Sequence, residues 1–237
     1  MKLSAPIYRL KRQARILSRK EGIPLHKALD NIAAKEGFSS WSLLAAHMSA
    51  ASPAKTLLAQ FSPGDLILLG ARPGHGKTQL SLELTVEAMK SGRQGVFFSL
   101  EYSLTNILDL FQGIGEDPTV FRDSFEFDTS DNISAEYIMD QLANFPAGTV
   151  VVIDYLQLLD QKRKNPELMG QVRALRIFAS QRGLIMVFLS QIDRSFNPLA
   201  EHCPGLEHVR LPNPLELRLF NKACFIHNGE LAFSTTQ

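Results

Sequence analysis

The stretch ARPGHGKT at residues 71–78 constrains the fold of this chain more than any other feature. It follows an apolar run, DLILLG, and it matches the phosphate-loop pattern G-x-x-x-x-G-K-[ST] except at its first position. That position needs only a small residue. Gly74 and Gly76 of the loop let backbone N–H groups face an anion, and the positive end of the helix expected after the loop adds to the attraction. We therefore predict a nucleotide-phosphate site formed by Ala71, Arg72, Pro73, Gly74, His75, Gly76, Lys77, Thr78 and Gln79.

The rest of the chain alternates buried strands with helices. The strands are continuous apolar runs rather than alternating ones, which indicates a mostly parallel sheet covered on both faces. Right-handed crossovers then give a doubly wound α/β fold. The predicted strands are 65–70, 95–101, 124–128, the start of 149–159 and 184–191, the predicted helices are 77–90, 103–113, 134–143 and 166–181, and a final hairpin spans 217–233.

Composition places the chain among globular proteins. Hydrophobic residues make up 45% and charged residues 21%, so a substantial core can form. The longest apolar runs, such as GLIMVFL, are too short to span a bilayer, and MKLSAPIYRLKRQ at the start has no apolar signal core. Two cysteines are too few for a disulfide framework. These features predict a cytoplasmic protein with no membrane partner.

The net charge of +1 hides a strong asymmetry between the two parts of the chain. Residues 1–50 hold nine Lys/Arg and three Asp/Glu, a net of +6, whereas the remainder has a net of −5. Helical spacing predicts three short helices in this basic head. We predict a helical module at 1–50, a linker at 51–60 and an ATPase core at 61–237. Two interpretations of the head stay open: a nucleic-acid-binding or docking module, and a solvated cap.

Hydrolysis needs more than a phosphate loop, and three strand ends supply the further groups. Lys77 would reach the β- and γ-phosphates of ATP, and the Thr78 hydroxyl would ligate Mg²⁺. Asp154, which ends VVVID, would also hold Mg²⁺, because open α/β sheets place ligands at the carboxyl ends of their strands, and the alternative is an aspartate that only caps the turn after the strand. Glu101 after FFSL is a candidate general base, with a helix-capping role as the alternative. Gln191 could sense the γ-phosphate through its amide.

Together the motifs are more specific than any one of them. ARPGHGKT, FFSLE, VVIDYLQLL and FLSQIDRS occur in the order and approximate spacing of the C-terminal motor of DnaB-type replicative helicases, which the chain resembles from about 61 to 196. This family commonly has Ala at the first loop position. The resemblance implies a RecA-like P-loop ATPase that contacts single-stranded DNA during DNA replication and forms homo-oligomers. It also implies the catalytic roles given above for Lys77, Glu101 and Gln191.

The chain departs from the family in ways that keep a second interpretation open. The segment 196–219 is short, and the Lys-x-Arg pair of the family's motor does not follow the final hairpin. The chain therefore resembles a compact or truncated variant of that motor. The alternative is an ATP-binding adaptor or regulator that docks on DNA or a replication protein without efficient hydrolysis. KRK at 162–164 is a slightly favoured DNA contact. Cys224-x-x-His227 has a zinc-like spacing, but we favour a buried cysteine in the last strand.

Overall fold

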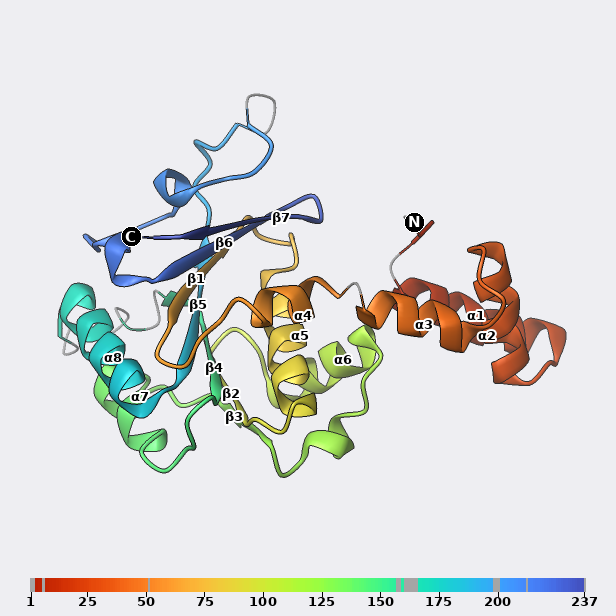
Figure 1. Ribbon diagram of the computed structural model, residues 1–237, viewed down its shortest axis with the longest axis horizontal. Helices are drawn as coiled ribbons and strands as arrows, with labels where there is room; N and C mark the ends of the chain where they lie inside the picture. The colour runs from red at the N-terminus through yellow and green to blue at the C-terminus, as the bar shows by residue number, and fades with distance from the viewer. Residues whose placement is uncertain are drawn as a thin grey trace.

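The computed structural model describes residues 3–5, 7–50, 52–156, 159, 166–197, 201–211 and 213–236. The chain forms a three-helix head followed by a seven-stranded sheet with helices on both faces (Figure 1). The predicted fold class, an α/β P-loop fold with a mostly parallel doubly wound sheet and a small helical module, is confirmed.

The sheet contains β1 (Leu66–Ala71), β2 (Gly95–Ser99), β3 (Phe125–Asp128), β4 (Val150–Asp154), β5 (Ile185–Gln191), β6 (Lys222–His227) and β7 (Glu230–Thr235). Its order is β3-β2-β4-β5-β1-β6-β7, and every neighbouring pair is parallel except β6 and β7. The predicted final hairpin is therefore present. Because β1, β2, β4 and β5 run in one direction, their carboxyl ends meet at one edge of the sheet.

Side chains from alternate positions of each strand build two separate cores. In β1, Leu66 and Leu68 join the core under α7 (Ala135–Gln141) and α8 (Leu168–Arg182). Ile67 and Leu69 join the core under α4 (Pro53–Leu58), α5 (Lys77–Lys90) and α6 (Leu104–Ile114). Burial on both faces explains the continuous apolar runs in the sequence. Two short 3-10 turns, Leu206–His208 and Leu217–Leu219, lie between β5 and β6.

Residues 53–58 differ from the linker predicted there. They form α4, which Ser52 caps by accepting a hydrogen bond from the Lys55 N–H at 3.4 Å, with Pro53 in its first turn. Ala54, Leu57 and Leu58 are buried in the same core as the phosphate-loop helix α5. The serine and proline that suggested a linker are a helix start, because proline at a first turn loses no hydrogen bond.

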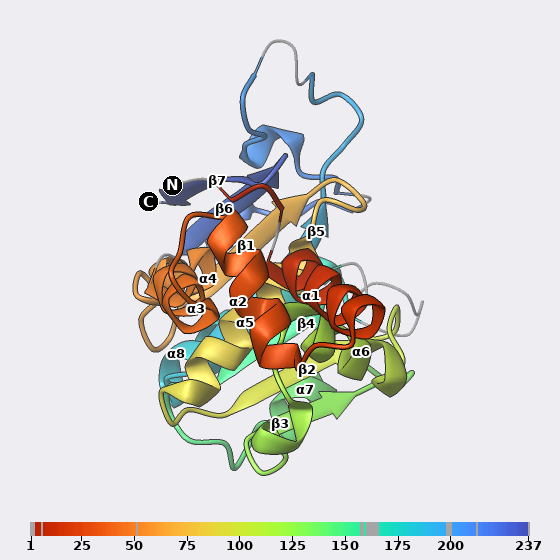
Figure 2. The ribbon, with the colours of Figure 1, turned by 90° about the vertical axis from the view of Figure 1, so that its right-hand side faces the viewer.

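The head consists of α1 (Ile7–Glu21), α2 (Leu25–Lys35) and α3 (Trp41–Ala50), which enclose a small core of their own (Figure 2). The Lys11 ammonium donates a hydrogen bond of 3.1 Å to the Gly115 carbonyl at the end of α6. Gly115 has a φ of +86°, a conformation in which glycine ends helices without strain. The head therefore contacts the larger domain through a lysine at a helix C-terminus.

Candidate nucleotide site

The loop between β1 and α5 forms a backbone cradle. Gly74 and Gly76 have φ values of +78° and +88°, and a Cβ on either would meet no neighbouring atom within 4 Å. Backbone conformation, rather than crowding, is thus the reason for these glycines. Helix α5 begins at Lys77 immediately after Gly76, and no side chain caps its first N–H groups. A helix start with free N–H groups is a suitable site for a phosphate anion.

Four predicted site residues from three elements meet at the start of α5. Lys77 Nζ lies 3.6 Å from Asp154 Oδ1 and 3.8 Å from Glu101 Oε2. The Thr78 hydroxyl donates a hydrogen bond of 3.1 Å to Asp154 Oδ2. Lys77 and Thr78 open α5, Asp154 ends β4, and Glu101 follows β2. Glu101 and Asp154 are far apart in the sequence, and the parallel register of β2 and β4, which pairs Ser99 with Asp154, brings them together. The pairing of β5 with both β4 and β1 places the start of α5 beside them.

Asp154 is the electrostatic centre of the group. Its side chain is fully buried, and burial raises the pKa of its carboxyl, with the Glu101 charge adding to the effect. Lys77 and the Thr78 hydroxyl oppose this rise in pKa. Among the described residues, no hydrogen bond reaches Oδ1. A buried carboxylate oxygen with this need for a partner fits Mg²⁺, which is held by oxygen ligands.

Glu101 occupies a different environment, because β2 ends at Ser99 rather than at the glutamate. The Ser99 hydroxyl accepts hydrogen bonds from the N–H groups of Glu101 and Tyr102, at 3.2 and 3.3 Å. This turn lifts Glu101 beyond the strand, where 37% of its side chain is exposed. A carboxylate that is held by its backbone and open to solvent can accept a proton from water. Sequence reasoning missed Ser99, whose place in an apolar run gave no signal of this role.

Gln191 and Arg72 lie on the other side of the loop. Gln191 ends β5 directly opposite Ala71 of β1, and its carbonyl accepts a hydrogen bond of 2.9 Å from the Arg210 N–H. The Arg72 guanidinium binds the Phe196 carbonyl and lies 5.2 Å from the centre of the Phe196 ring. Gln191 is therefore at the same sheet edge as the Lys77 group, whereas Arg72 is turned toward the segment after β5.

A row of aromatic rings connects the phosphate loop to the C-terminal hairpin. The rings of His75 and His227 stack with centroids 5.2 Å apart and an angle of 13°. His227 also meets Phe196 edge-on at 5.1 Å, and the Asn228 N–H donates to His75 Nδ1 at 3.5 Å. Burial lowers the pKa of His75, and the neighbouring His227 and Arg72 lower it further. The sequence indicated the hairpin but nothing in it placed the turn against the loop.

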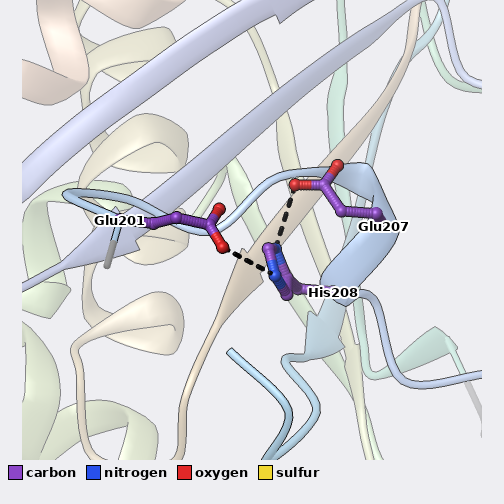
Figure 3. Close-up of side chains that lie close together, drawn as sticks. All are labelled: Glu201, Glu207 and His208. Atoms are coloured by element: carbon purple, nitrogen blue, oxygen red, sulfur yellow. Dashed lines mark ion pairs between the residues drawn. The ribbon is translucent and has the colours of Figure 1, made fainter. Parts of the chain in front are cut away.

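Residues of the types that ligate zinc lie in separate environments in the described C-terminal part of the chain. Cys224 is buried in β6, and the Cys203 thiol contacts the Phe225 carbonyl at 3.5 Å. Figure 3 shows a different group, in which His208 lies between Glu207, 3.0 Å from Nδ1, and Glu201, 3.5 Å from Nε2. Neither cysteine is part of that group within the described chain. The predicted burial of Cys224 in a C-terminal strand is confirmed.

Two further sequence predictions concern nucleic acid and membranes. KRK at 162–164 lies outside the described residues, so its predicted DNA contact stays a prediction. In the part of the chain that is described, none of the helices combines the length and the apolar character needed to cross a bilayer.

The parallel sheet, the phosphate loop and the converging Lys77, Thr78 and Asp154 define a P-loop domain of the RecA-like class. Two solved structures share its fold. One is an ATPase domain, with a TM-score of 0.57 and 18% identity over 79% of this chain and 82% of that one. The other is a DnaB-like replicative helicase described with its interactions with primase, with a TM-score of 0.59 and 15% identity over 95% of this chain and 71% of that one.

Sequence comparison specifies the family more closely. Residues 53–111 match the family described as DnaB-like helicase C terminal domain. A probable plasmid replicative DNA helicase of Chlamydia muridarum is 28% identical over an alignment of 187 residues, which covers 65% of this chain and 41% of that protein. The chain thus spans about two fifths of the length of this relative. The resemblance found in the sequence is confirmed: residues 53–111 match the DnaB-like helicase C-terminal family, and the chain is similar to replicative DNA helicases in sequence and to a DnaB-like helicase in fold.

Proposed function

We propose that this protein is a Mg²⁺-dependent ATPase of the DnaB helicase type, which couples ATP hydrolysis to contact with single-stranded DNA. The observation that carries the proposal is the buried Asp154 carboxylate, which the Thr78 hydroxyl and the Lys77 ammonium reach from the start of α5. A P-loop lysine and hydroxyl beside a carboxylate at a strand end are the parts that bind the phosphates and Mg²⁺ in nucleotide hydrolysis, and Glu101 adds the base.

Each residue has a distinct role in the proposed reaction. Lys77 and the N–H groups at the start of α5 bind the phosphates, and Thr78 and Asp154 hold Mg²⁺, which neutralises charge on the phosphate oxygens when bound. Glu101 accepts a proton from the water that attacks the γ-phosphorus, and the bond to the β-phosphate oxygen breaks to give ADP and phosphate. Gln191 senses the γ-phosphate. The exposure of Glu101 supports its role, because the attacking water must reach it.

The relatives support the partners that we propose. Their names describe replicative DNA helicases, and one solved structure describes interactions with primase. We therefore propose single-stranded DNA as the polymer that the core contacts, homo-oligomers as the working form, a replication protein as a further partner, and the cytoplasm as the location. The domain division proposed is a head at 1–50 followed by the ATPase core, with α4 assigned to the core.

The test is ATP turnover with and without single-stranded DNA for the wild type, Lys77→Ala and Glu101→Gln. We expect Glu101→Gln to lower turnover by about 10²- to 10⁴-fold, the usual contribution of a general base. Glu126→Gln is the matched control, because Glu126 is exposed on the edge strand β3 and should leave turnover unchanged.

The outcome also separates the enzyme from the adaptor. Turnover that DNA stimulates and that both site variants lose supports the ATPase. No turnover in the wild type, with ATP binding that Lys77→Ala abolishes, refutes hydrolysis and leaves an ATP-bound adaptor.

A further inference from the structure

Helix α1 of the head presents a row of three arginines to solvent, which we call the arginine stripe: Arg12, Arg15 and Arg19. These positions follow the spacing i, i+3 and i+7, so their side chains lie within about 60° of one another around the helix. All three are exposed, whereas Leu10 and Ala14 on the same helix are buried in the core of the head. The apolar face of α1 therefore packs in the core of the head, and the arginine stripe takes no part in that packing.

The charge of the stripe is not neutralised within the described part of the chain. No ion pair joins any of its arginines to an acid there. Two of the three acids of the head have other partners: Asp30 accepts the Trp41 N–H at 2.8 Å, and Glu36 accepts the Ser4 N–H at 2.8 Å. Like charges at this spacing destabilise a helix by about 0.2–0.5 kcal/mol per pair. An anionic partner would offset this repulsion.

The neighbouring Lys11 shows how α1 is oriented on the protein. Its ammonium is directed to the Gly115 carbonyl, and burial lowers its pKa while Glu116 opposes the decrease. On a helical wheel Lys11 lies about 70° from the middle of the stripe. The contact with the larger domain consequently leaves the stripe uncovered, as the exposure of its arginines shows.

We propose that the arginine stripe is a second nucleic-acid site, which binds the phosphate backbone of single-stranded DNA without reading its bases. Guanidinium groups pair with phosphates through a planar fork of N–H donors, which suits Arg better than Lys. The choice of DNA rests on the proposed function of the core, but the binding requires no nucleotide. A membrane surface fits less well, because an interfacial helix needs an apolar face and that of α1 is occupied.

The test measures the binding of the full chain to a fluorescein-labelled oligothymidylate of about 20 nucleotides by anisotropy, without ATP. The test variant is Arg12→Gln/Arg15→Gln/Arg19→Gln. Each phosphate contact with a single strand contributes about 0.7 to the slope of log K against log salt, so three contacts contribute about 2. Affinity near 0.1 M salt should then fall by about 100-fold, with a correspondingly shallower slope. A control removes three positive charges elsewhere in the head: Lys20→Gln/Lys27→Gln/Lys35→Gln.

The expected result is a large loss in the arginine variant and a much smaller loss in the lysine control, with both variants retaining the wild-type circular dichroism spectrum. If both variants lose the same affinity for the oligonucleotide, the net charge of the head rather than the arginine stripe is responsible for binding, and the proposal is wrong. An unchanged affinity in the arginine variant would also refute the proposal. Stronger binding to phosphatidylserine vesicles than to DNA would also overturn it. The Lys77→Ala variant should bind the oligonucleotide as the wild type does, so failure of ATP hydrolysis leaves this test intact.

Discussion

The close contact between helix α5 and the start of strand β2 can be tested by adding one methyl group at Gly95. A Cβ at this position would overlap Thr85 Cγ2 and would lie 3.4 Å from Met89 Sδ. Thr85 is fully buried, and its hydroxyl donates a hydrogen bond of 2.9 Å to the Ser81 carbonyl. Rotation of the threonine to avoid the new methyl group would break that hydrogen bond, so either the clash or its relief destabilises the fold.

The magnitude follows from two opposing effects. Overpacking a well-filled core costs about 1–3 kcal/mol. Replacing glycine by alanine restricts the unfolded chain and returns about 0.4–1 kcal/mol. Gly95→Ala should therefore lower the free energy of unfolding by about 1–2 kcal/mol, which corresponds to a melting temperature lower by about 2–4 °C for each kcal/mol.

A double-mutant cycle isolates the contact. Thr85→Ser keeps the hydroxyl and removes the methyl group that meets the new Cβ, at a cost of about 1 kcal/mol for the lost burial. In the double variant the added methyl group occupies the space that Cγ2 leaves, so its free energy of unfolding should be close to that of Thr85→Ser alone. Urea unfolding of the four proteins, followed by circular dichroism, measures the coupling. If Gly95→Ala costs as much in the Thr85→Ser background as in the wild type, the steric explanation is wrong.

Three further predictions concern the two thiols and the stack of His75 on His227. Iodoacetamide at pH 8 should modify Cys203 in the folded protein much faster than Cys224, because burial raises the pKa of the Cys224 thiol to about 12; equal rates would contradict this. Since that pKa lies above the unfolded value, the free energy of unfolding should be largest below about pH 9 and decline as the pH rises toward 12, and Cys224→Ala should lack this part of the decline. His227→Ala removes the ring stacked on His75, and we expect ATP affinity to fall by about 2- to 10-fold in titration calorimetry, since such pairs contribute about 0.5–1.5 kcal/mol. Unchanged affinity would show that the stack does not support the phosphate loop.

Much of the fold follows from local patterns in the sequence. Apolar runs indicated the strands, because a strand that is buried on both faces has no polar positions. The glycines at 74 and 76 indicated the loop, and both have the positive φ that this residue type permits. Asp154 could be placed at the sheet edge from the end of its apolar run alone. The error at 53–58 has a local cause as well, since serine followed by proline begins a helix as readily as it forms a linker.

Other features depend on which segments become neighbours in space. The approach of Asp154 to Lys77 requires β4 and β1 to lie on either side of β5, and the approach of Glu101 to the same lysine requires the pairing of β2 with β4. The stack of His75 on His227 likewise requires β6 to lie beside β1.

Local sequence patterns were thus enough to establish the α/β class, the phosphate loop and the identity of the groups around it, because backbone conformation and burial leave local signals. Long-range packing determined how close the charged groups of the site lie to Lys77, which ring stacks on His75 of the loop, and which face of α1 stays exposed. These properties arise from contacts between residues far apart in the chain, and such contacts leave no periodicity or spacing in the sequence.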